Sequence, residues 1–245
     1  MTTNLDIVLA AHGAGDGSAA NALVRSCAQR IEAGTCGVRV TAAFRLGTPT
    51  YAAALHDADR RDVLVVPLLT SDGYFARSLR REIRRLSHRA KAPTVLAPFG
   101  TNQRFLQAVA DEVAAVARRR AAAEGPKTVV VVAHGTRRCI EGGAAALAVA
   151  KAIARRCGLA AHAAYLEQDP TIEDVVSSVP RDADLLIVPF LLGGGAHAVR
   201  DVPSRIAAAA ATRGIPEDRV TLVEPLQGLS ALTRLVKDII DEARG

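Results

Sequence analysis

The stretch from residue 184 to residue 206, DLLIVPFLLGGGAHAVRDVPSRI, holds the pattern that decides the fold. Its apolar run at 184–192 is too rich in Leu, Ile and Val to be half solvated, so it predicts a strand buried on both faces. Three glycines at 193–195 let the backbone turn and approach a ligand closely, and Pro203 suits the first turn of a helix. His197 is therefore expected on a loop beyond the carboxyl end of a strand, where open α/β sheets bind their ligands.

Seven further segments have the composition of strands. With the run at 184–192, the expected strands are 5–11, 38–44, 63–69, 94–97, 128–133, 160–166, 184–192 and 220–223. Apolar residues at helical spacing lie between several of them, as in the series Leu23, Cys27 and Ile31. Regular alternation of strands and helices is typical of parallel sheets that helices cover on both faces, so the predicted fold class is α/β.

The second half of the chain repeats the first. The segment DVLVVPLLTSDGYFA at 62–76 matches DLLIVPFLLGGGAHA at 184–198, and the His-Gly pairs that begin at His12 and His134 are likewise 122 positions apart. The charged segment RRRAAAEGPK at 118–127 is the natural joint, because a helix cannot simply continue through Gly-Pro. We predict two halves of one fold, 1–120 and 127–245, each a parallel sheet flanked by helices, with a cleft between them that both His-Gly turns face.

Composition narrows the class of protein. With 49% hydrophobic residues and apolar runs far shorter than the ~20 residues of a membrane helix, we expect a soluble cytoplasmic protein that does not bind a membrane. The four cysteines lack C-x-x-C spacing, which argues against a zinc knuckle, an iron–sulfur cluster or a disulfide framework. A net charge of +6 favours an acidic partner. Few aromatics and no nucleic-acid motif argue against nucleic acid, and no phosphate-binding motif supports a nucleotide.

Polar side chains follow three strands of the second half. His134 and Glu167 end the strands expected at 128–133 and 160–166, and His197 follows the run at 184–192. Because the carboxyl ends of parallel strands share one edge of a sheet, the three side chains should converge on one pocket. Two imidazoles and a carboxylate can hold a divalent metal transiently and accept protons, since imidazole has a pKa of about 6.5. A turn or capping role is the alternative for each histidine taken singly.

The first half keeps only part of this set. His12 corresponds to His134, but Phe75 stands where the second half has the histidine of its glycine loop, and Leu46, after a one-residue shift, stands where the second half has its glutamate. We expect this half to have lost the metal chemistry and to form the opposite wall of the cleft. The alternative is that Phe75 and Leu46 are core residues.

Other candidate residues lie on the expected strand-end loops. Guanidinium groups there could pair bidentately with ligand carboxylates, although most arginines are only solvated surface charges. These arginines are Arg45, Arg137, Arg138 and Arg200. Cys139, near His134 in the sequence, is a further candidate ligand for a soft metal.

Three motifs of the second half resemble a known family: HGTR at 134–137, YLEQDPTIEDVV at 165–176 and VPFLLGGGAHAVRDVP at 188–203. They are similar to the sirohydrochlorin metal chelatases, the cobaltochelatases and ferrochelatases of cobalamin and sirohaem synthesis, which belong to the ATP-independent class II chelatases. The resemblance covers nearly the whole chain, as the long two-repeat form of the family. It implies two chelatase-like α/β halves with the macrocycle bound between them.

The resemblance also implies site roles. His134 and His197 are then the catalytic, metal-binding histidines, and Glu167 is the assisting carboxylate. The expected substrate-binding residues are His12, Arg45, Arg137, Arg138, Gly194, Gly195 and Arg200. This sequence departs from the family where it has HGTRRC instead of HGSR followed by an acid, and where the first repeat lacks the histidine pair that family members often carry.

These observations predict a chelatase that inserts Co²⁺ or Fe²⁺ into sirohydrochlorin without a nucleotide. Such a reaction needs weak, exchangeable ligands that also accept protons, whereas a closed thiolate site would hold the metal too tightly. Imidazole and carboxylate also accept Ni²⁺, so the residue types leave the metal open. The polycarboxylate macrocycle suits the basic charge, and a monomer is expected because both halves lie in one chain. The alternative is a non-catalytic carrier of a tetrapyrrole or a metal.

Overall fold

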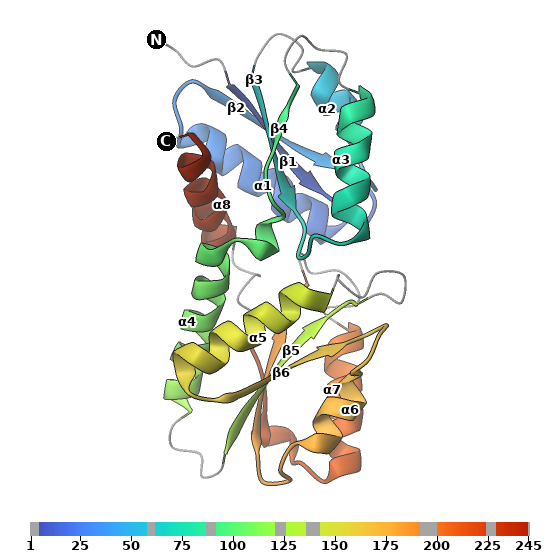
Figure 1. The fold of residues 1–245 in the computed structure, drawn as a ribbon, viewed down its shortest axis with the longest axis vertical. Coiled ribbons are helices and arrows are strands. Elements are labelled where there is room, and N and C mark those ends of the chain that lie inside the picture. Colours follow the sequence, from blue (N-terminus) through green and yellow to red (C-terminus); the bar gives the residue numbers. More distant parts are fainter. Residues whose placement is uncertain are drawn as a thin grey trace. The chain divides into compact units, whose positions relative to one another are not determined.

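A computed structural model of the chain describes residues 5–57, 62–86, 92–120, 126–135, 143–191, 200–223 and 229–244 (Figure 1). Strands and helices alternate throughout these ranges. The strands are β1 Leu5–Ala11, β2 Val38–Phe44, β3 Asp62–Leu68, β4 Thr94–Val95, β5 Lys127–Ala133, β6 Ala160–Tyr165, β7 Asp184–Pro189 and β8 Val220–Leu222. The helices are α1 Ala19–Ala33, α2 Tyr51–Asp57, α3 Tyr74–Leu86, α4 Gln103–Arg119, α5 Ala144–Cys157, α6 Ile172–Ser178, α7 Val202–Arg213 and α8 Leu229–Arg244, with short 3₁₀ helices at Phe99–Thr101 and Glu217–Arg219.

The strands form two parallel four-stranded sheets of the same topology. Their orders are β2-β1-β3-β4 and β6-β5-β7-β8, so the first strand of each half lies inside its sheet. Every residue of β7 is buried, as the apolar composition of the run at 184–192 predicts, although the strand ends at Pro189 and not at 192. The predicted α/β class and the repeat of one fold are thereby confirmed.

Equivalent strands of the two halves pair in matching register. Ala11 at the end of β1 is paired with Phe44, and Ala133 at the end of β5 is paired with Tyr165. The carboxyl ends of β1 and β5 therefore lead directly into the two His-Gly turns. This register places each turn beside the loop that follows the neighbouring strand.

The last helix of each half in sequence packs with the other half. The chain divides into two compact units, Met1–Asn102 with Gly228–Gly245, and Gln103–Gln227. Helix α8 packs on α1, and α4 packs on α5. The Phe105 ring of α4 also lies 5.8 Å from the ring of Phe190, which directly follows β7. The units therefore differ from the expected halves 1–120 and 127–245, because the apolar face of α4 is buried in the second unit.

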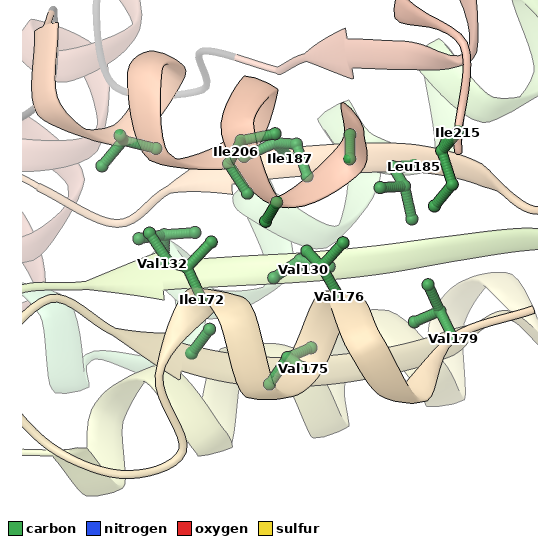
Figure 2. Close-up of a cluster of buried hydrophobic side chains, with 14 of the residues drawn as sticks. Val130, Val132, Ile172, Val175, Val176, Val179, Leu185, Ile187, Ile206 and Ile215 are labelled. Carbon is green, nitrogen blue, oxygen red and sulfur yellow. The ribbon is translucent and has the colours of Figure 1, made fainter. Parts of the chain in front are cut away.

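The second unit has a hydrophobic core on the face of its sheet that α6 and α7 cover. Val130 and Val132 of β5 and Leu185 and Ile187 of β7 point into this core (Figure 2). Helix side chains that include Ile172, Val176 and Ile206 fill it from the other side (Figure 2). Burial of these aliphatic side chains, each contributing about 1.5–3 kcal/mol, fixes the strands whose ends carry the candidate site.

Candidate metal-binding edge of the second sheet

The turn after β5 begins with His134, whose ring is tied to its own backbone. Nδ1 lies 3.0 Å from the carbonyl oxygen of Gly135. A carbonyl oxygen can only accept, so Nδ1 carries the hydrogen of this bond, and Nε2 of the neutral ring keeps its lone pair. Half of the side chain is exposed. The local hydrogen bond therefore selects the tautomer in which Nε2 can bind a metal or accept a proton.

Glu167, in the loop after β6, lies beside His134. Its backbone N–H donates to the carbonyl oxygen of His134 at 3.0 Å, which ties the two strand-end loops together. Its carboxylate oxygen Oε2 lies 3.7 Å from Nδ1 of the histidine ring, and 59% of its side chain is exposed. The carboxylate thus approaches the protonated side of the ring, opposite to the nitrogen that keeps the lone pair.

Several predicted site residues lie outside the described residues. They are His197, Gly194, Gly195, Arg137, Arg138 and Cys139. Arg200 is described; it is exposed and lies two positions before α7, which has Pro203 in its first turn as expected. Among the residues that the structure describes, no three His, Cys, Asp or Glu side chains gather as a metal site. Two members of the predicted set, His134 and Glu167, are thus brought together in the described part of the chain.

The first half repeats this backbone arrangement with other side chains. His12 Nδ1 lies 3.0 Å from the Gly13 carbonyl oxygen, and the N–H of Leu46 donates to the carbonyl of His12 at 2.8 Å. Leu46 thus occupies the structural position of Glu167, as the one-residue shift predicts. The Phe75 ring meets the His12 ring edge-on, with 4.4 Å between centroids.

Phe75 and Leu46 are not core residues. Their exposed fractions are 47% and 49%, and that of the neighbouring Tyr74 is 45%. The Phe75 ring contacts both His12 and Tyr74, and the backbone of Leu46 is bonded to His12. We call Leu46, Tyr74 and Phe75 the apolar edge. Most large apolar side chains of the described chain are buried, so this group marks a surface suited to an apolar ligand.

Arg45 provides a positive charge beside the apolar edge. It is exposed at the end of β2, its guanidinium carbon lies 6.0 Å from the centre of the Phe75 ring, and Nη1 donates to Ser78 Oγ at 3.3 Å. An arginine next to an aromatic face suits a flat ligand that carries carboxylates, because it can pair with the charge at the rim of the ligand.

Sequence reasoning missed Arg205, which supports the loop of Glu167. Its guanidinium donates to the carbonyl oxygen of Leu166 at 2.9 Å and forms a two-pronged pair with the carboxylate of Glu173. The hydrogen bond from Arg205 lowers the pKa of Glu173. In the sequence, Arg205 is one of many helix arginines, and its distance of 39 positions from Leu166 gives no local signal of the contact.

Two other histidines lie away from the strand ends. In the described part of the chain, His56 is exposed on α2 and His162 is exposed within β6, so neither lies at the carboxyl end of a strand. None of the helices in the described ranges is both long and apolar enough to cross a bilayer.

Comparison with known proteins gives a consistent relationship. A probable sirohydrochlorin cobaltochelatase of Halobacterium salinarum is 25% identical over 188 residues, which are 67% of this chain and 63% of the relative. The match thus spans less than two thirds of the length of that relative. Two solved structures share the fold. CbiX, described as the terminal enzyme of sirohaem biosynthesis in denitrifying bacteria, is 24% identical with a TM-score of 0.68, and the match covers 96% of this chain and 98% of CbiX. SirB from Bacillus subtilis with Fe³⁺ is 16% identical with a TM-score of 0.71, and the match covers 96% and 94%.

The family model CbiX matches two segments, residues 6–116 and 128–243. The two segments begin within β1 and β5, the equivalent inner strands of the two sheets. Because these matches cover both repeats and most of the sequence, the chain belongs to the CbiX family.

Proposed function

We propose that this protein inserts a divalent metal ion, Co²⁺ or Fe²⁺, into sirohydrochlorin or a related polycarboxylate tetrapyrrole, with no nucleotide. Family membership supports a tetrapyrrole substrate. The name of the Halobacterium relative supports cobalt, and the SirB structure with Fe³⁺ supports an iron-binding site on the same fold. The metal is a substrate of this reaction and leaves in the product.

The single observation that carries the proposal is the arrangement of His134 and Glu167. Insertion exchanges water on the metal for four pyrrole nitrogens and releases two N–H protons. The Nε2 lone pair of His134 can bind the incoming metal or accept one of these protons. The Glu167 carboxylate, 3.7 Å from Nδ1, stabilises the ring when it is protonated and gives the proton a path to solvent.

His197 completes the proposed metal site. The first half has Phe75 at the equivalent position, and there its ring touches the ring of His12. The repeat therefore supports a pair of imidazoles in the second half, formed by His134 and His197. Two imidazoles bind Co²⁺ and Fe²⁺ weakly enough to exchange, as a site that hands on its metal requires.

The first half supplies apolar contact for the macrocycle in this proposal. The apolar edge exposes three large side chains, of which Phe75 contacts His12, and Arg45 lies beside the Phe75 ring. A tetrapyrrole has a flat apolar face and carboxylates at its rim, which match these two features. The remaining substrate contacts are assigned to Arg137, Arg138, Arg200 and the glycines Gly194 and Gly195.

The test is turnover. The purified protein, at about one hundredth of the sirohydrochlorin concentration, is mixed with Co²⁺ or Fe²⁺, and the absorbance of the macrocycle is followed. Repeated turnover is expected, with rates at least tenfold lower for His134→Ala and His197→Ala and unchanged for His162→Ala, a matched exposed histidine on β6. Product limited to one equivalent of protein would contradict the proposal and indicate a carrier.

A further inference from the structure

A side-chain amide fills the space between the His-Gly turn and the start of the next helix in both halves. The amide comes from the helix in the first half and from the neighbouring strand-end loop in the second. In the second half this turn carries His134, the proposed metal ligand.

In the first half this group is Asn21, a fully buried residue of α1. Its Oδ1 accepts the N–H of Ala14 at 3.1 Å, and its Nδ2 donates to the carbonyls of Gly15 and Leu46 at 3.0 and 3.1 Å. One amide thus joins the turn after β1 to the loop after β2. The facing loop position, Gly47, has no room for a side chain, because a Cβ there would lie 2.4 Å from Asn21 Nδ2.

In the second half the helix position is Gly143, and the amide belongs to Gln168. A Cβ built on Gly143 would lie 2.6 Å from Gln168 Nε2 and 2.8 Å from Tyr165 Oη, and one built on Gly135 would lie 2.7 Å from Gln168 Cγ. The Gln168 side chain is therefore held between the turn of His134 and the start of α5. It enters this space from the loop that also carries Glu167.

The two arrangements are related by the repeat. The buried faces of the helices correspond at a spacing of 122, as in Ile31 and Ile153, which pairs Asn21 with Gly143. The loop residues correspond at a spacing of 121. Leu46 donates to the carbonyl of His12, and Glu167 donates to the carbonyl of His134. Gly47 is therefore the counterpart of Gln168. In the first half the helix has the amide side chain and the loop has the glycine. In the second half the glycine is at the start of the helix and the amide side chain is in the loop.

We propose that Gln168 is a positioning residue for the metal site, and that the pair Gly143 and Gln168 is the counterpart of the pair Asn21 and Gly47. The packing of Gln168 against Gly135 holds the turn of His134. Because Gln168 directly follows Glu167, it also holds the backbone of Glu167 beside that turn. This inference rests on the proposed function for the identity of the metal ligands. The amide exchange itself rests only on the described contacts.

The test compares Gln168→Gly, Gly143→Asn and the double variant with the wild-type protein. Gly143 has φ −78° and ψ −17°, which asparagine adopts freely. The readouts are the affinity and visible spectrum of bound Co²⁺ without macrocycle, and the free energy of unfolding in denaturant. Gln168→Gly empties the space, and Gly143→Asn overfills it.

Each single variant is expected to weaken Co²⁺ binding at least tenfold and to change the Co²⁺ spectrum. The double variant removes the clash with Gln168, but a Cβ at position 143 would still lie 2.8 Å from Tyr165 Oη, so that hydroxyl must shift. It is expected to bind Co²⁺ more tightly than either single variant. Asn21→Gly is the matched control, because it removes the corresponding amide from the other half. It should lower the unfolding free energy and leave the Co²⁺ affinity unchanged.

Wild-type affinity in Gln168→Gly, or a double variant no better than the worse single variant, would overturn the inference. Unfolding free energies separate this result from a failure of the proposed function. If the wild type binds no Co²⁺ while positions 143 and 168 remain coupled in stability, the metal assignment fails and the exchange of amides stands. If the two positions are uncoupled in stability, the exchange itself is refuted.

Discussion

Replacing Phe75 with alanine tests whether the first half contributes binding energy without metal chemistry. The Phe75 ring is 47% exposed, yet it is held in place by edge-on contacts with His12 and Tyr74, whose ring centroids lie 4.4 and 5.5 Å away. A ring already fixed in the free protein loses little freedom when a ligand covers it. Phe75→Ala should therefore weaken binding of the macrocycle and leave the insertion step intact.

The exposed area sets the size of the effect. A phenylalanine buries roughly 150–250 Å² when it is fully covered, so the exposed half of Phe75 offers about 70–120 Å² to a ligand. At about 25 cal/mol per Å² this area corresponds to roughly 2–3 kcal/mol, and the alanine methyl retains part of it. A loss of about 1.5–2.5 kcal/mol remains, which raises the Kd about 10- to 70-fold.

The assay is a titration of the protein with sirohydrochlorin in the absence of metal, followed by steady-state kinetics with Co²⁺. The expected result is a raised Kd and KM with kcat within about threefold of the wild type, the pattern of a lost uniform binding contact. Leu147→Ala is the matched control, because Leu147 is 45% exposed on α5 and lies outside the apolar edge. Equal effects of the two substitutions, or a fall in kcat alone at Phe75, would refute the reasoning.

Three further predictions concern the charged and titratable groups. His134→Ala should lower kcat more than tenfold and His12→Ala much less, since the first half lacks the glutamate and the second histidine; equal losses would show that His12 shares the metal site. Arg205 holds the pKa of Glu173 below its ordinary value of 4.5, so this carboxylate stabilises the fold above that pH and the stabilisation is lost as the pH falls through the lowered pKa. Glu173→Gln should therefore flatten the pH dependence of the unfolding free energy below pH 4.5, and an unchanged profile would contradict this assignment. Arg200→Ala should raise KM for sirohydrochlorin and reduce the salt dependence of kcat/KM, because exposed charges act mainly on capture of a polyanion; unchanged values of both would place Arg200 outside the binding surface.

The architecture of each sheet was predictable because its signals are local. A strand such as β7 is recognised from a short apolar run. Because each element occurs once in each repeat, a strand expected in one half is supported by its counterpart in the other half. All the expected strands occur in the structure. His134 and Glu167 could be assigned to one edge from strand order alone, since parallel strands place their carboxyl ends together.

The packing partners of the terminal helices were not predictable from these signals. Helix α4 is the last helix of the first repeat, but Phe105 packs against Phe190 of the second unit. Periodicity shows that a helix has an apolar face and does not show which sheet covers it. Periodicity also does not show that the ring of Phe75 is half exposed, although a phenylalanine suits a core position.

The contacts that hold the site depend on residues far apart in the chain. Arg205 reaches the carbonyl of Leu166, and the amide that packs on the His-Gly turn comes from Asn21 in one half and from Gln168 in the other. Sequence by itself determined the strands and the repeat and supplied candidates for a metal site, because hydrophobic period and turn chemistry act over a few neighbours. Only the tertiary structure decided which side chain fills each space beside those residues, because packing depends on volumes that meet after the chain has folded.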